Sequence, residues 1–122
     1  ISIILLVLIC VASIIMLTEL TSNTATASTF IPILGATALG LGQDPLLLII
    51  PATLAASCAF MMPVATPPNT IAYASGHLKI SDMIKAGIWL NIISLIIIGV
   101  IIALILGPVF DVELNKIPLW VK

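Results

Sequence analysis

Charged side chains are scarce in this sequence: four lysines, five acidic residues and no arginine make up 7% of its 122 residues. An ordinary soluble domain carries about 25% charged residues, so a large solvated surface is excluded. The net charge of -1 and the lack of a basic cluster also exclude nucleic acid and an anionic membrane surface as partners. The chain has instead 61% hydrophobic residues and a mean hydropathy of +1.36, which indicates an integral membrane protein.

Residues suited to catalysis are equally few. The sequence has one histidine, no pair of carboxylates at a useful spacing and no glycine-rich phosphate loop, so an enzyme is the weakest function class. Cys10 and Cys58 lie within apolar stretches, where we expect small buried side chains rather than a disulfide or a metal site. No organic cofactor is expected.

The chain begins at Ile1 rather than at methionine, and its first apolar run starts without a preceding loop. We therefore expect one small domain or a piece of a larger protein, with room for roughly three or four membrane passes of about 20 apolar residues each. A signal peptide is the alternative for the first run. It lacks a charged leading region, however, and Glu19 lies between the apolar run and the small residues Ala25 and Ala27.

Four apolar segments follow one another, at residues 1–18, 29–42, 45–64 and 84–109. Only the last is long and uninterrupted enough to be a simple membrane-spanning helix, which ends at Gly107 and Pro108. Between the third and the fourth segment, a polar stretch around His77 and Lys79 marks an exit to water. We expect these two residues to be solvated.

Two polar interruptions divide the remaining segments, TELTSNTATAS at 18–28 and MPVATPPNT at 62–70. Backbone that leaves helical geometry in a membrane strands N–H and C=O groups, so it survives only beside a polar cavity or buried in protein. At the second interruption, prolines at 63, 67 and 68 predict an extended Val64 to Pro68 within a discontinuous helix, 45–64 and then 69–76.

The segments on either side of the first interruption are short. At about 1.5 Å per residue, residues 1–18 and 29–42 form helices of roughly 27 Å and 21 Å. Small polar residues join them rather than charged loop residues. A re-entrant helical hairpin over residues 1–42 therefore fits better than two full passes, with the longer first arm as the weaker part of this interpretation.

Helix dipoles give the two interruptions a function. The first arm and the 45–64 helix each end at a break and offer carbonyl groups, which attract cations. The second arm and the 69–76 helix each begin at a break and offer free N–H groups, which attract anions. Paired interrupted segments of this kind are typical of the midplane site of a secondary transporter.

The stretches TELTSNTATAS and SCAFMMPVATPPNTIAYASGHLKISDMIKAG resemble the divalent-anion/sodium symporter (DASS) family, which carries dicarboxylates, citrate and sulfate with sodium. The triplet Ser22-Asn23-Thr24 resembles the family's hairpin-tip motif, and residues 66–70 resemble its unwound loop. The resemblance covers nearly the whole chain and implies the C-terminal part of the transport domain. It implies an all-α membrane fold with a re-entrant helical hairpin (1–42), one discontinuous transmembrane helix (45–76), one continuous transmembrane helix (84–109) and a tail (110–122).

This arrangement would be half of an inverted-repeat transporter that works as an elevator within a homodimer. The matching N-terminal half of the carrier is missing from the chain. The resemblance also implies a multi-pass protein of the plasma (inner) membrane, with the lipid bilayer as its surroundings. Charge alone leaves the orientation open, because residues 76–85 and the tail carry two lysines each. The resemblance places the 76–85 loop in the cytoplasm and the tail outside.

The resemblance further implies which residues bind the ion and the substrate. The implied sodium (Na+) site consists of Thr18, Thr21, Asn23 and Ala65. The implied substrate site for a small divalent anion consists of Ser22, Asn23, Thr24, Thr66, Pro67 and Asn69. Neutral donors suit this role, because a fixed arginine in the membrane is costly and would hold the anion too tightly for release.

Several alternatives stay open. The Ser22-Asn23-Thr24 run can be a plain helix cap, and the Pro67-Pro68 pair can be a loop outside the membrane. Glu19 lies at the wrong helix end for an anion, so it is protonated, exposed in a polar cavity or compensated by a cation.

For the function, we expect sodium-coupled symport of a C4-dicarboxylate such as succinate. The alternatives are a carrier for citrate or sulfate, or a structural membrane subunit that transports nothing.

Overall fold

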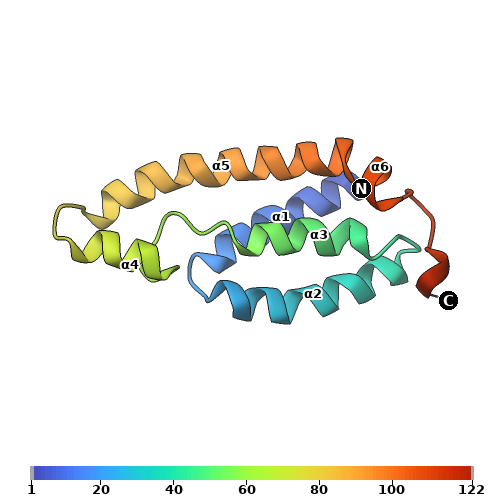
Figure 1. Ribbon diagram of the computed structural model, residues 1–122, viewed down its shortest axis with the longest axis horizontal. Coiled ribbons are helices and arrows are strands. Elements are labelled where there is room, and N and C mark those ends of the chain that lie inside the picture. The colour runs from blue at the N-terminus through green and yellow to red at the C-terminus, as the bar shows by residue number, and fades with distance from the viewer. Residues whose placement is uncertain (1, 122) are drawn as a thin grey trace.

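The computed structural model describes residues 2–121, which fold into helices without any strand (Figure 1). The helices are α1 (Ile3–Thr18), α2 (Asn23–Gly40), α3 (Leu46–Ala56), α4 (Pro67–Ala74), α5 (Ile80–Leu104) and α6 (Leu106–Phe110), followed by the 3-10 turn η1 (Leu119–Val121). The all-α prediction is thereby confirmed.

Helices α1 and α2 form a helical hairpin whose turn is shorter than the sequence predicted (Figure 1). Helix α2 begins at Asn23, six residues before the expected segment at 29–42. Ser22 has an extended backbone and its Oγ accepts a hydrogen bond from Ala25 N, so it acts as the N-cap residue. Most of the polar stretch therefore belongs to the first turns of α2, and the break is confined to residues 19–22.

The break between α3 and α4 is wider than predicted. Helix α3 ends at Ala56 rather than near Val64, and residues 57–66 are non-helical. Thr66 is extended, but Val64 and Ala65 lie in a turn and Pro67 and Pro68 form the first turn of α4, so the expectation of an extended Val64 to Pro68 is wrong except at Thr66. The first helical turn accepts proline because its N–H groups have no intrahelical partner there.

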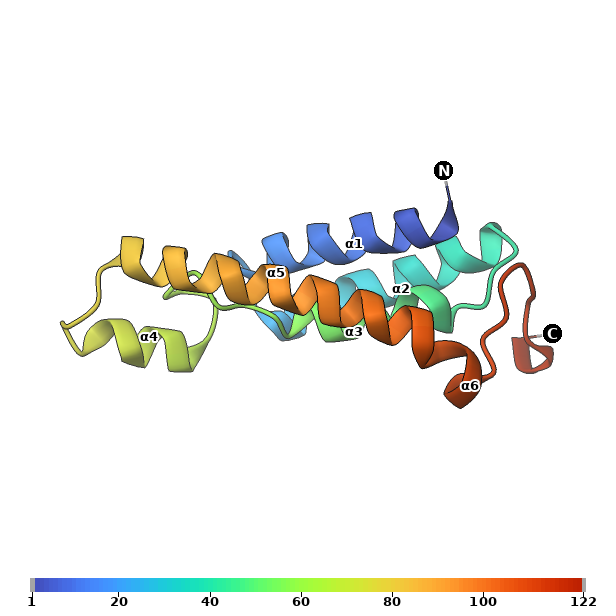
Figure 2. The ribbon, with the colours of Figure 1, turned by 90° about the horizontal axis from the view of Figure 1, so that it is seen from above.

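Helix α5 runs beside α1 and α3 along most of the molecule (Figure 2). It begins at Ile80, four residues before the expected segment, and the helical chain is interrupted at Ile105 before α6. Pro108 explains that interruption, because it cannot donate to the carbonyl of Leu104. Among the described helices, α5 is the one long and apolar enough to cross a membrane.

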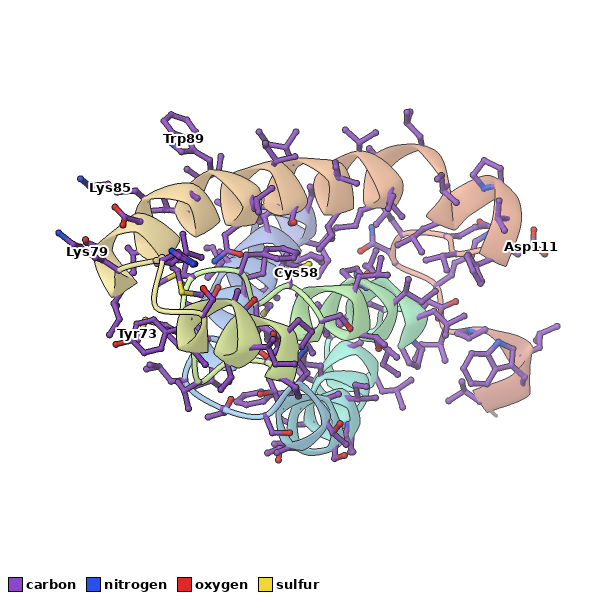
Figure 3. The ribbon with its side chains drawn as sticks, turned by 60° about the vertical axis from the view of Figure 1, so that its left-hand side comes forward. Cys58, Tyr73, Lys79, Lys85, Trp89 and Asp111 are labelled. Atoms are coloured by element: carbon purple, nitrogen blue, oxygen red, sulfur yellow. The ribbon has the colours of Figure 1, made fainter. Side chains whose placement is uncertain are left out.

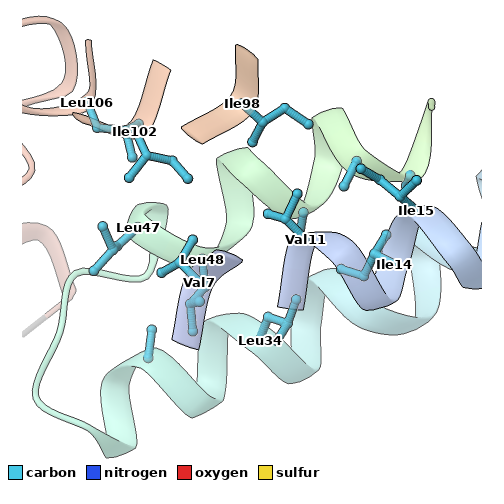
Figure 4. Packing of buried hydrophobic residues seen from close by; sticks show 14 of the residues in the cluster. Val7, Val11, Ile14, Ile15, Leu34, Leu47, Leu48, Ile98, Ile102 and Leu106 are labelled. Atoms are coloured by element: carbon cyan, nitrogen blue, oxygen red, sulfur yellow. The ribbon is translucent and has the colours of Figure 1, made fainter. Parts of the chain in front are cut away.

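Helix α3 lies at the centre of the packing, in contact with α1, α2 and α5. Its small residues Ala52, Ala55 and Ala56 are at most 2% exposed and let the neighbouring helices approach closely. Figure 4 shows Val7 and Leu48 within the apolar cluster that these helices share. This core holds the ends of α1 and α3 side by side, which places the two helix breaks together.

The polar exit predicted between the third and fourth segments is the turn between α4 and α5. His77 and Lys79 are exposed there. Figure 3 shows Lys79 and Lys85 at this end of the molecule, with Asp111 at the opposite end of α5. Trp89 points away from the bundle and is 66% exposed. The solvated character of the exit turn agrees with the expectation from the sequence.

Candidate functional site

A cavity of about 800 Å³ lies where the two helix breaks meet. One side is formed by the turn of the α1–α2 hairpin and the first residues of α2, and the other by the end of the α3–α4 loop and the start of α4. The lining residues are Leu20, Thr21, Ser22, Asn23, Thr24, Val64, Ala65, Thr66, Pro67, Thr70 and Ile71. The two interruptions, which the sequence placed at 18–28 and 62–70, thus share one cavity.

The carbonyl ends of α1 and α3 meet behind this cavity at Thr18. Thr18 is fully buried, and its Oγ1 lies 2.6 Å from Asn23 Oδ1 and 2.9 Å from the carbonyl oxygen of Ala56. A hydroxyl carries one hydrogen, so it cannot satisfy both acceptors fully. Three oxygens therefore converge with a single hydrogen among them. Such an excess of neutral oxygen acceptors suits a hard cation.

A second group of oxygens lies on the same turn. Thr21 Oγ1 donates to the carbonyl of Leu17 at 3.0 Å and is 2.7 Å from Thr26 Oγ1. Ala65 lines the cavity from the opposite loop and is 6% exposed. Thr21, Asn23 and Ala65, three of the four residues of the expected sodium set, thus line one cavity, and Thr18 contacts Asn23 directly.

The two helices that begin at the breaks differ in the donors they offer. The first N–H groups of α2 belong to Asn23 and Thr24, which line the cavity and have no acceptor within the helix at that position. In α4, by contrast, Pro67 and Pro68 have no N–H, and Asn69 N donates to Thr66 Oγ1 at 3.3 Å. The expectation of free N–H groups is therefore wrong for α4, which contributes only the positive end of its dipole.

Asn69 is placed differently from the other expected substrate residues. Ser22, Asn23, Thr24, Thr66 and Pro67 all line the cavity, whereas Asn69 does not. Its Nδ2 donates to the carbonyls of Ala59 and Met62, at 3.0 Å and 3.1 Å. Both amide hydrogens of Asn69 therefore bind carbonyls of the α3–α4 loop. Asn69, which belongs to α4, stabilises the conformation of the loop that precedes it.

Glu19 lies outside the cavity lining and is 2% exposed, which excludes exposure in a polar cavity. Its carboxylate accepts hydrogen bonds from the backbone N–H groups of Phe60, Met61 and Met62 and from the side chain of Asn91. Glu19 is the one acid of residues 1–28, and Asn91 is the one amide of the last apolar segment. Isolated polar residues in apolar segments are expected to pair, and this signal could have revealed their contact.

Two further groups that supply an oxygen atom near the site were not predicted from the sequence. The carbonyl of Ala56 carries no signal, because any residue at the end of α3 would supply it. Thr26 lies three residues after Asn23 on α2 and is 3% exposed. A buried hydroxyl on the same helix face as Asn23 was predictable from that spacing.

Paired helix breaks that share one cavity, beside a long apolar helix, are features typical of the secondary-transporter class of membrane proteins. Residues 1–110 match the family model of the sodium:sulfate symporter transmembrane region. The chain belongs to this family, which confirms the resemblance drawn from its motifs.

Curated relatives agree with this assignment. The chain is 39% identical over 117 residues to the sodium-dependent dicarboxylate transporter SdcS of Staphylococcus saprophyticus, which covers 96% of this chain and 22% of that protein. It is 47% identical over 105 residues to SdcS of Staphylococcus aureus strain MRSA252, covering 86% of this chain and 20% of that protein. The chain thus spans about a fifth of the length of these relatives.

Proposed function

We propose that this chain is the C-terminal part of the transport domain of a sodium-coupled symporter for small divalent anions, with C4-dicarboxylates such as succinate as substrates. The observation that carries the proposal is the shared cavity at the two helix breaks, which the start of α2 lines, with the converging oxygens of Thr18, Asn23 and Ala56 next to it. The relatives named as sodium-dependent dicarboxylate transporters support the choice of ion and substrate class.

Thr18, Thr21, Asn23 and Ala65 are the proposed sodium ligands. The converging oxygens of Thr18, Asn23 and Ala56 fit such an ion, because they outnumber the hydrogens available to them. The carbonyl ends of α1 and α3 add the negative ends of two helix dipoles. When bound, sodium offsets part of the charge of the substrate.

The proposed substrate site lies in the cavity itself and shares Asn23 with the sodium site. Ser22, Asn23 and Thr24 donate to one carboxylate of the substrate through hydroxyl, amide and first-turn N–H groups, which the start of α2 presents together. Thr66 and Pro67 form the facing wall, and Asn69 keeps that wall in place through its bonds to the loop. The site contains no fixed positive side chain among these residues, so the anion can be released.

The membrane arrangement is also a proposal. Helix α1 has 16 residues. At about 1.5 Å per residue it reaches roughly 24 Å, short of a hydrocarbon core of about 30 Å, which supports a re-entrant hairpin. We propose a multi-pass protein of the inner membrane, half of an inverted repeat in an elevator-type homodimer, with the exposed α4–α5 turn in the cytoplasm and the tail outside.

The test is sodium-dependent succinate uptake by the full-length carrier that contains this chain. Asn23→Ala should abolish uptake while the protein still reaches the membrane, because Asn23 takes part in both proposed sites. Ser13→Ala is the matched control, since its exposed hydroxyl bonds only to its own helix at Ile9. Undiminished uptake by the Asn23 variant would remove that residue from the site.

The description of the family model favours sulfate as a second candidate substrate. Competition by sulfate and by citrate against labelled succinate in the same flux assay separates these anions. A structural subunit without a solute site makes a different prediction, namely that sodium does not raise the melting temperature of the protein. A carrier that binds sodium should melt higher as the sodium concentration rises.

A further inference from the structure

A buried oxygen without a hydrogen-bond partner lies on α5, outside the cavity at the two helix breaks. Asn91 is 5% exposed, and its Nδ2 donates to Glu19 Oε1 at 2.7 Å. That bond identifies the other end of the amide as the acceptor Oδ1, because a carboxylate oxygen needs a donor. Oδ1 is buried and has no hydrogen-bond partner in residues 2–121. An unpaired carbonyl is costly in a membrane, so we expect a donor from outside these residues.

Asn91 also lines an apolar groove between α1 and α5, two helices that lie side by side (Figure 2). The groove has a volume of about 240 Å³. On α5, Ile92 and Leu95 share the helix face of Asn91, and on α1, Ala12 and Met16 lie across from them. Met16 and Ile92 are exposed, so the groove is open to the surroundings of the bundle. Asn91 is the one polar side chain in the lining.

Neither water nor a lipid tail suits this groove. A buried water needs two to four polar partners, and its share of liquid volume is only about 30 Å³. The groove offers one polar side chain in a much larger apolar space. A lipid acyl chain matches the apolar walls but has no hydrogen to donate. The occupant therefore combines an apolar surface with a hydrogen-bond donor.

An apolar helix that carries a serine or threonine has both properties. Such a hydroxyl can bond to its own helix until a partner is reached, as Thr53 Oγ1 does with Ile49 O at 2.8 Å. Serine and threonine also form hydrogen bonds between helices in membranes. Because the chain spans about a fifth of the length of its curated relatives, a carrier of that length has about four fifths of its residues elsewhere.

We propose that an apolar helix from the part of the carrier outside this chain packs into the α1–α5 groove and donates a serine or threonine hydroxyl to Asn91 Oδ1. Asn91 then joins two parts of the carrier, because its Nδ2 bonds to Glu19, which in turn accepts from the backbone of residues 60–62. The inference rests on the proposed function only in treating this chain as part of a longer carrier. It assumes nothing about the ion or the substrate.

Photo-cross-linking in the full-length carrier identifies the occupant of the groove. A diazirine amino acid replaces Ile92, the carrier is irradiated in its membrane, and the linked peptides are identified by mass spectrometry. We expect a linked peptide from an apolar segment outside residues 1–122, with a serine or threonine within one helical turn of the linked residue. Links to lipid alone, to residues 1–122 alone, to another polypeptide or to a second copy of the carrier would overturn the inference, as would the absence of any link.

Ile93 is the matched control position. It has the same side chain as Ile92 and is 48% exposed, against 43% for Ile92. It lies about 100° further around the helix, outside the groove lining. The same probe at position 93 should not link the segment with the serine or threonine. Equal yields of that link from both positions would show that the segment does not lie in the groove.

A double-mutant cycle then tests the hydrogen bond itself. Replacing the linked serine by alanine, or the linked threonine by valine, should lower the melting temperature of the carrier by about 2 °C. In the Asn91→Ala carrier, the same replacement should leave melting unchanged, because the acceptor is gone. The loss of the donor to Glu19 is common to both Asn91→Ala proteins and cancels in the comparison. Equal falls in both backgrounds would refute the bond.

The cross-link decides alone if Asn91→Ala does not reach the membrane. Failure of this inference is distinct from failure of the proposed function. A carrier without sodium-dependent uptake in its original form would overturn the proposed function and leave the cross-link and the melting cycle unaffected.

Discussion

The two helix breaks differ in how they pair the backbone N–H and C=O groups that have left helical geometry. The break between α1 and α2 covers residues 19–22, and its groups are satisfied within a few residues, by the Ser22 cap and by Thr21 Oγ1 on Leu17 O. The break between α3 and α4 covers residues 57–66, and only its first N–H groups and that of Ala65 bind carbonyls a few residues away. Its middle depends on side chains from outside the loop: Glu19 accepts from the N–H groups of residues 60–62, and Asn69 donates to two of the carbonyls.

This difference follows from length. A four-residue turn lets each polar group reach a neighbour in sequence, whereas a ten-residue loop in an apolar bundle leaves more backbone groups than its own side chains can pair. The short break should therefore tolerate substitution, and the long break should depend on a few distant residues.

The largest effect is expected for Gly87→Ala, which acts on the long break through α5. The added Cβ would lie 2.6 Å from Met61 Cα, against rigid backbone. We expect a loss of about 3 kcal/mol or more in stability, because neither helix nor loop can yield cheaply. Thermal melting of the purified carrier measures this loss. Gly40→Ala is the control, since nothing lies within 4 Å of its Cβ position, and equal melting of the two variants would contradict the tight contact.

Asn69→Leu should destabilise the carrier next most strongly. It leaves the carbonyls of Ala59 and Met62 without their donor, at a cost of about 2 kcal/mol. The melting temperature should fall, while the KM for succinate of the folded fraction changes little. A raised KM with unchanged melting would instead make Asn69 a direct ligand of the substrate.

Thr18→Val tests the point where the two breaks meet. The variant keeps the size of the side chain but removes the hydroxyl between Asn23 Oδ1 and Ala56 O, at a cost of about 1 kcal/mol. The rise in melting temperature with sodium should disappear. Thr37→Val serves for comparison, because that exposed hydroxyl bonds only to Ile33 O on its own helix. Persistence of the sodium effect in the Thr18 variant would exclude this hydroxyl from the ion site.

The smallest effect is expected for Ser22→Ala in the short break. The capping bond from Ala25 N to Ser22 Oγ is long, at 3.4 Å, so its loss should cost about 0.5 kcal/mol. Melting should hardly change, and the KM for succinate should rise because a proposed donor is lost. A stability loss as large as that of the Asn69 variant would remove the distinction between the two breaks.

Much of the fold was predictable from the sequence, because apolar runs and proline positions act locally. The long apolar segment predicted α5, and the two polar interruptions predicted that the helices break twice, although α3 stops at Ala56 rather than near Val64. The errors have local physical reasons as well. Ser22 caps α2 earlier than the hydrophobic pattern suggests, and Pro67 begins a helix instead of extending the chain.

Membership of a sodium-coupled transporter family followed from motifs that lie within the chain, so the sequence by itself determined the class of protein and the residues at each break. Only the tertiary structure decided that Glu19 binds the 60–62 backbone, that Ala56 O joins Thr18, and that Asn69 turns toward the loop. These contacts join residues up to 43 positions apart. In these contacts a side chain binds a backbone group. Because every residue carries backbone groups, no pattern of side chains in the sequence predicts which of them is bound.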